Sequence, residues 1–111
     1  MWGDTLVSVG RDGCLRLGSL DFSLSCTHAI HAAHGAGVAV HCAVTRGDDL
    51  YTGGGDGRVR VWRRDAGGVC AQLCSTAACA SPVRALCCGA GAQHVVAGHA
   101  DGTLRVWLAT P

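Results

Sequence analysis

The sequence predicts an all-β protein built from small antiparallel sheets that recur along the chain. Three Asp-Gly pairs, at residues 12–13, 56–57 and 101–102, are separated by 44 and 45 residues. Apolar and polar residues alternate after these pairs, most strictly in the segment 58–62 (RVRVW). Alternation with a period of two is typical of a strand, and Asp-Gly favours a tight hairpin turn. A repeat of this length is typical of solenoids and propellers.

The middle repeat carries four residues whose spacing matches a known family. His34 precedes Asp56 by 22 residues, Thr52 lies between them, and Trp62 follows Asp56 by six residues. This pattern resembles the WD-repeat (WD40) family of β-propellers, and the resemblance covers roughly residues 6–107. It implies that the four residues form a hydrogen-bonded structural brace inside one blade, the four-stranded sheet of such a propeller.

The resemblance implies strands grouped in three blades. Val38, four residues after His34, is expected near the start of the one complete blade. The blades are expected at residues 1–31, 34–75 and 79–111, and only the second has all four strands. The strands are expected at residues 5–9, 14–17, 23–30, 38–44, 49–53, 58–62, 69–74, 83–88, 94–98 and 103–107. These WD40-type antiparallel blades would form an incomplete, open array, with no closed ring from this chain alone.

The first and third repeats match the family pattern only in part. Gly18 stands where the first repeat should have tryptophan, and in the third repeat Cys79 replaces histidine and Ala97 replaces the hydroxyl residue. The brace is therefore expected to be complete only in the middle repeat. The partial brace consists of Ser8, Asp12, Asp101 and Trp107.

Two chemical alternatives exist for the middle repeat. His34, Thr52 and Asp56 could form a hydrolytic triad, but no oxyanion-hole motif or nucleophile elbow accompanies them. The glycine run 53–55 could bind phosphate, but no helix and no Gly-Lys-Ser/Thr follows it. Small residues are instead expected where neighbouring blades crowd together. We therefore expect no catalytic residues and no enzyme.

Composition narrows the classes of partner. A formal net charge of +1 provides no basic surface for nucleic acid or for an acidic membrane. No apolar run approaches the roughly 20 residues of a membrane helix, and the N-terminus shows no secretory signal. We expect an intracellular protein, cytoplasmic or nuclear, that binds a protein or peptide rather than nucleic acid or a membrane.

The eight cysteines are expected to be thiols that bind no metal. Disulfides are disfavoured without a secretory signal, and cysteine inside a strand commonly serves as a small buried apolar residue. Cys70 and Cys74 would lie about 13 Å apart on one strand, which is too far for a shared zinc ion. No cofactor is expected, and a thiol- or metal-responsive module is kept as an alternative.

The WD-repeat resemblance implies a protein–protein interaction scaffold. Its binding face would carry the loops between blades and the turns inside them. An open array leaves two blade faces and several strand edges uncovered. We therefore expect a fragment or short isoform of a larger propeller, which missing blades could complete and which is not a well-folded monomer alone. A truncated product without binding function and a ubiquitin-ligase substrate receptor are alternatives. The candidate partner-binding residues are Arg11, His31, Ser81, Arg84 and His99.

Overall fold

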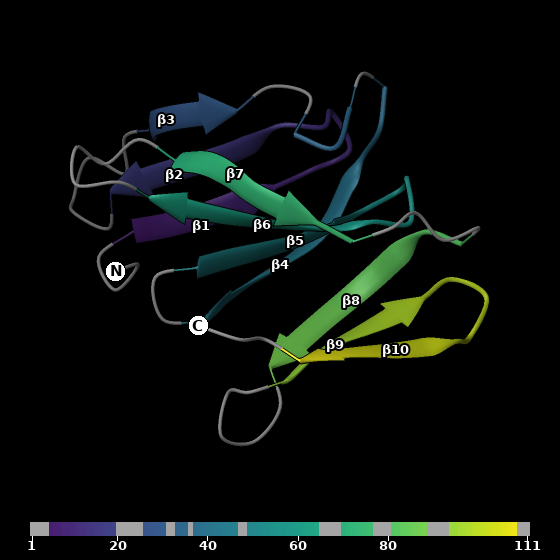
Figure 1. Ribbon diagram of the computed structural model, residues 1–111. Coiled ribbons are helices and arrows are strands. Elements are labelled where there is room, and N and C mark those ends of the chain that lie inside the picture. Colours follow the sequence, from purple (N-terminus) through teal and green to yellow (C-terminus); the bar gives the residue numbers. More distant parts are fainter. Residues whose placement is uncertain are drawn as a thin grey trace.

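The computed structural model describes residues 5–19, 26–30, 33–35, 37–46, 49–64, 70–76, 81–88 and 94–108. Within these residues, ten strands form three separate antiparallel sheets, which confirms the expected fold class (Figure 1). The middle sheet lies between the other two, and no described strand closes the array into a ring. The described residues include no helix of the length and hydropathy needed to span a membrane.

The strands follow the chain in order within each sheet. The first sheet contains β1 (Thr5–Val9), β2 (Leu15–Ser19) and β3 (Cys26–Ile30). The middle sheet contains β4 (Val40–Arg46), β5 (Asp49–Gly54), β6 (Val59–Arg64) and β7 (Cys70–Ser75). The third contains β8 (Val83–Cys88), β9 (His94–His99) and β10 (Leu104–Leu108). The expected strand limits agree closely, although residues 23–25 and residue 69 lie outside the described part. The blade limits at residues 31, 34, 75 and 79 stay predictions.

The three Asp-Gly pairs close their hairpins in the same way. The carboxylates of Asp12, Asp56 and Asp101 each accept a hydrogen bond from the backbone N–H two residues later, at 3.0, 3.1 and 3.0 Å. The glycine after each aspartate has a positive φ, of 79°, 75° and 88°. Residues with a side chain rarely adopt this conformation. The recurring pair in the sequence therefore reflects one turn used three times.

Two hydrophobic clusters hold the sheets together. Side chains alternate along a strand, so Leu50 and Tyr51 in β5 point toward opposite neighbours. The middle sheet is thus covered on both faces, and every residue of β5 is buried. The cluster between the first and middle sheets consists of Leu15, Leu17, Ala33, Val40, Leu50 and Trp62. The cluster between the middle and third sheets consists of Tyr51, Val59, Val83, Val95 and Ala97.

The start of β4 differs from the expectation. Val40, rather than Val38, pairs with Gly54 at the end of β5, and Val83 holds the same position opposite the end of β9. Val40 is 2% exposed, whereas Val38 is only half-buried. The strand therefore starts six residues after His34 rather than the expected four, because the chain turns there before it enters the sheet.

Close approaches to β5 explain two glycines of the run 53–55. A Cβ atom on Gly53 would collide with the side chain of Val83 and would lie 2.8 Å from Sγ of Cys42. A Cβ atom on Gly54 would lie 2.6 Å from Nδ1 of His34. The first glycine lets the third sheet approach the middle sheet, and the second leaves room for an imidazole ring.

Candidate functional site

The structure brings His34, Thr52, Asp56 and Trp62 together at one end of the middle sheet. Nε1 of Trp62 in β6 donates to Oγ1 of Thr52 in β5 at 2.9 Å. That hydroxyl lies 2.7 Å from Nε2 of His34. Nδ1 of the same ring lies 3.0 Å from Oδ1 of Asp56 in the hairpin turn. The four side chains form one continuous chain of hydrogen bonds.

One arrangement of hydrogens satisfies every contact in this chain. An indole N–H can only donate, so Thr52 accepts from Trp62 and directs its own hydrogen to Nε2 of His34. The remaining ring nitrogen then carries its proton and donates to Asp56. This arrangement needs a neutral imidazole. Burial lowers the pKa of His34 below its ordinary value of 6.5, and this effect outweighs the opposing influence of Asp56.

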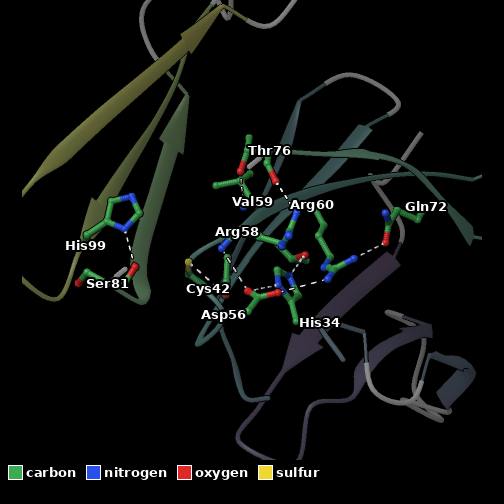
Figure 2. A network of polar contacts seen from close by, with 12 residues as sticks. His34, Cys42, Asp56, Arg58, Val59, Arg60, Gln72, Thr76, Ser81 and His99 are labelled. Carbon is green, nitrogen blue, oxygen red and sulfur yellow. Dashed lines mark hydrogen bonds and ion pairs between the residues drawn. The ribbon is translucent and has the colours of Figure 1, made fainter. Parts of the chain in front are cut away.

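Asp56 connects the brace to the outer strands of the sheet (Figure 2). Its Oδ1 accepts the backbone N–H of Arg58 at 3.1 Å, and its Oδ2 accepts Nη2 of Arg60 at 3.2 Å. Nη1 of Arg60 in turn donates to Oε1 of Gln72 in β7 at 2.9 Å. Partial burial alone would raise the pKa of Asp56, but the hydrogen bonds from His34, Arg58 and Arg60 outweigh it and keep the carboxylate ionised.

The role of Arg60 was missed by the sequence analysis, although a signal was available. Arginine follows each aspartate at a spacing of four, in the segments 12–16, 56–60 and 101–105. In the first repeat this spacing also gives an ion pair, between Asp12 and Arg16 at 3.1 Å. In the first two repeats this spacing therefore marks a contact between the turn and the strand that leaves it.

The buried chain of contacts resembles a hydrolytic triad in its order of hydroxyl, imidazole and carboxylate. Thr52 is 0% exposed and His34 is 2% exposed, so a substrate cannot reach either group. The hydroxyl oxygen also accepts from Trp62, which occupies one of its two lone pairs. The geometry supports a structural brace over a triad.

The third sheet has a different polar interior. Ala97 occupies the place of Thr52 and is fully buried, so it offers Trp107 no hydroxyl. His99 corresponds to Gly54 by the shift of 45 residues between the two repeats. Its Nδ1 contacts the carbonyl oxygen of Ser81 at 2.9 Å (Figure 2). Nε2 of His99 is buried and finds no hydrogen-bond partner among the described residues. Oγ of Ser81 accepts the backbone N–H of Asp101 at 2.9 Å.

The first sheet shows no brace among its described side chains. Ser8 is exposed, and Gly18 supplies no indole. Asp12 holds its turn and pairs with the exposed Arg16. The backbone N–H of Cys14 and the guanidinium of Arg16 lower the pKa of Asp12. The aspartate therefore serves only its own hairpin here.

The hairpin turns and the segments that precede β4 and β8 meet at the same end of the sheets. We call this surface the turn end, and it comprises residues 10–13, 33–35, 37–39, 55–57, 81–84 and 99–102. Backbone hydrogen bonds join its parts: Val40 N–H to Gly10 O at 3.0 Å, Gly55 N–H to Ala39 O at 2.9 Å and Ala100 N–H to Pro82 O at 2.9 Å. These bonds join the segment before β4 to the turns of the first and middle sheets, and the segment before β8 to the turn of the third sheet.

The five candidate partner-binding residues do not share one environment. Arg11 and Arg84 are exposed at the turn end, and no described residue forms an ion pair with either. Ser81 and His99 differ from the expectation because they are 8% and 6% exposed, and their mutual contact holds the loop before β8. They cannot offer most of their side chains to a partner. His31 lies outside the described residues.

The described cysteines occupy contrasting environments. Cys42 and Cys87 are thiols, and Cys14 and Cys88 also lie in the described part of the chain. Burial raises the pKa of Cys42 to about 11, whereas Cys87 is exposed. In the part of the chain that the structure describes, no group of three or more His, Cys, Asp or Glu side chains could hold a metal ion. The expectation of eight metal-free thiols stays a prediction.

The sequence itself matches the profile of the family described as "WD domain, G-beta repeat" (WD40) at residues 19–63 and 70–107. These matches span more than half of the chain, and the chain belongs to the WD40 repeat family. No curated protein is significantly similar to it in sequence.

Solved structures share the same fold. The crystal structure of the computationally designed Ika4 protein matches with a TM-score of 0.74 and 23% identity, over 96% of this chain and 61% of that chain. The crystal structure of RRP9 WD40 repeats matches with a TM-score of 0.74 and 21% identity, over 86% and 32%. The designed Ika8 protein matches with a TM-score of 0.72 and 24% identity, over 96% and 30%. This chain thus spans less than two-thirds of each of those chains.

Proposed function

We propose that the chain is part of a WD40 interaction scaffold that binds a protein or peptide at the turn end. The observation that carries this proposal is the construction of the middle sheet. Its brace is closed from Trp62 to Asp56, and both of its faces are covered by neighbouring sheets. Exposed turns anchored on such a sheet are held in fixed positions, so that little conformational entropy is lost when a partner binds.

Two exposed arginines of the turn end, which form no ion pair with a described residue, favour an acidic ligand. Arg11 and Arg84 stand exposed there, and arginine forms strong paired hydrogen bonds with carboxylate or phosphate groups. We propose that the partner carries an acidic segment that contacts both side chains. No described residue favours a narrower role, such as substrate reception in a ubiquitin ligase.

The proposed role is non-catalytic and intracellular. The groups that could perform acid–base chemistry, His34 and Asp56, are used within the brace. A chain with eight cysteines that are expected to be thiols suits a reducing compartment, and we propose that the protein lies in the cytoplasm or nucleus.

Selection from a library of random dodecapeptides displayed on phage tests the proposal, with the purified chain as bait. We expect acidic peptides to be enriched and their binding to weaken at least about tenfold in Arg11→Glu and Arg84→Glu variants. Arg105→Glu is the matched control, because Arg105 is exposed but lies on β10, outside the turn end. Equal binding by all three variants, or selection of no acidic peptide, would contradict the proposal.

A further inference from the structure

Arg84 occupies a β-bulge at the start of β8. Strand pairing places Val83 opposite His99 and Ala85 opposite Gly98, so two steps along β8 match one step along β9. Arg84 is the extra residue, and a bulge leaves its extra residue outside the regular strand pairing and redirects the side chain. Arg84 is exposed, although Val83 beside it is 0% exposed. The position of this arginine therefore depends on how the chain is held before the bulge.

Three consecutive residues hold the segment before the bulge. Nδ1 of His99 lies 2.9 Å from the carbonyl oxygen of Ser81 (Figure 2). The backbone N–H of Ala100 donates to the carbonyl oxygen of Pro82 at 2.9 Å. The backbone N–H of Asp101 donates to Oγ of Ser81, also at 2.9 Å. We call these three hydrogen bonds the clamp, and its His99 bond is the one that a side chain donates.

The clamp uses only one nitrogen of the His99 ring. A carbonyl oxygen can only accept, so Nδ1 carries a proton and donates it to Ser81. Nε2 is buried and has no hydrogen-bond partner in the part of the chain that the structure describes. The ring is 6% exposed, which leaves it unable to contact a ligand directly. Its polar function is therefore limited to the bond with the segment before β8.

The middle sheet has a bulge at the equivalent place but anchors it differently. A register shift between Val40 and Cys42 leaves His41 as the extra residue of β4. The backbone N–H of Val40 donates to the carbonyl oxygen of Gly10 in the first sheet at 3.0 Å. Val83 is the counterpart of Val40, and no backbone hydrogen bond between described residues joins it to the turn of the middle sheet. The hydrogen bonds that anchor the start of β8 therefore come from its own sheet.

We propose that His99 is a positioning residue for ligand binding at the turn end. Through Nδ1 it holds the segment before β8, so that Arg84 is presented to an acidic ligand in one orientation. Arginine binds a carboxylate through two parallel hydrogen bonds, which require a defined orientation of the guanidinium group. A fixed backbone also reduces the entropy lost on binding. The ligand in this inference rests on the proposed function, whereas the effect of His99 on the backbone of Arg84 does not.

The order of the Arg84 backbone tests the proposal without any ligand. His99→Leu fills the buried space with an apolar side chain but removes the donor. We expect the NMR order parameter of the Arg84 amide to fall from about 0.85 to below about 0.6 in this variant of the 111-residue chain. His99→Asn should restore it, because the amide nitrogen of asparagine can take the place of Nδ1. Val95→Ala is the control, since Val95 is buried in the same sheet outside the clamp.

A binding measurement tests whether the effect of His99 acts through Arg84. The probe is an octaglutamate peptide, titrated against the same variants by calorimetry. We expect His99→Leu to weaken binding at least about fivefold, because a mobile arginine loses more entropy when it is bound. In a chain that also carries Arg84→Ala, His99→Leu should change binding by less than about twofold, since the two substitutions then remove the same interaction. His99→Asn should bind as the original chain does.

An Arg84 amide that is equally ordered in the original chain and in His99→Leu would overturn the proposal. An equal loss of order in Val95→Ala would also overturn it, because the loss would then report a general weakening of the third sheet. Octaglutamate binding that Arg84→Ala does not weaken would instead contradict the proposed function. The order of the Arg84 amide in the absence of the peptide would still decide whether His99 positions it.

Discussion

The middle and third sheets use the same turn and the same strand pairing around different polar interiors. In the middle sheet Thr52 joins the indole of Trp62 to the imidazole of His34. In the third sheet Ala97 stands at that point, and the buried imidazole of His99 keeps one nitrogen without a described partner. The fold therefore forms with the turn and the apolar contacts alone, and we expect the complete polar brace to add stability to the middle sheet.

The two tryptophans should give the largest difference between the sheets. Trp62 is 5% exposed and hydrogen-bonded, whereas Trp107 is half-buried and faces an alanine. We expect Trp62→Ala to cost roughly 3–5 kcal/mol and Trp107→Ala to cost at least about 1 kcal/mol less. Native-state hydrogen exchange of the β5 and β9 amides measures both. Equal losses would show that the brace contributes nothing beyond apolar burial.

Removal of the Thr52 hydroxyl alone should isolate the contribution of the brace to stability. Thr52→Val keeps the shape of the side chain but leaves the N–H of Trp62 and Nε2 of His34 without their partner. We expect a loss of about 2 kcal/mol in the stability of the middle sheet, because each buried polar group left unpaired is costly. Thr45→Val is the control, since Thr45 is exposed on β4 and should change stability by less than about 0.5 kcal/mol. The same exchange experiment measures both variants.

The equivalent glycines of β5 and β9 should respond differently to alanine. A methyl group on Gly53 would collide with Val83, so Gly53→Ala is expected to cost about 1–3 kcal/mol through overpacking. Gly98→Ala has open space and should change stability by less than about 0.5 kcal/mol. Urea unfolding of the two variants compares them. A large loss of stability in the Gly98→Ala variant would contradict this expectation.

Acidification should weaken the middle sheet selectively, with the smallest effect of the four. The pKa of His34 is lowered by burial, with the charges of Arg60 and His41 acting in the same direction. Below the ordinary value of 6.5 the unfolded chain therefore binds more protons, and stability falls as the pH drops from 7 to 5. The lowered pKa of Asp56 adds a further loss of stability below its ordinary value of 3.8.

Hydrogen exchange of the β5 amides, corrected for the intrinsic exchange rate at each pH, measures the stability of the middle sheet. A stability that is constant from pH 7 to pH 5 would contradict the prediction. In His34→Gln the decline between pH 7 and pH 5 should diminish.

Much of the fold could be predicted because it depends on local patterns. The Asp-Gly turns and the alternation in segments such as 58–62 fix the hairpins, and the spacing of His34, Asp56 and Trp62 identifies the repeat. The start of β4 was placed two residues early, at Val38 instead of Val40, because pairing with Gly54 decides it and spacing does not.

The candidate site was less accessible to sequence reasoning. The burial of Ser81 and His99 depends on a contact between residues 18 positions apart, so their place on the turn end gave no sign of it. The role of Arg60 could not be predicted, because an arginine in an alternating strand is expected to face solvent. Its carboxylate partner, Asp56, lies in the turn. The sequence shows that Leu104 and Val106 are apolar. Their exposure could not be predicted, because it depends on how the three sheets are arranged.

The space above Gly54 has an evolutionary consequence. The imidazole of His34 occupies the volume that a side chain at position 54 would need. In the third repeat both of these positions, which lie 20 residues apart, differ: Cys79 stands in the first position and His99 in the second. We therefore expect substitutions at these two positions to be coupled. Aligned relatives should show covariation, with a bulky residue at the second position only where the first position has lost its histidine.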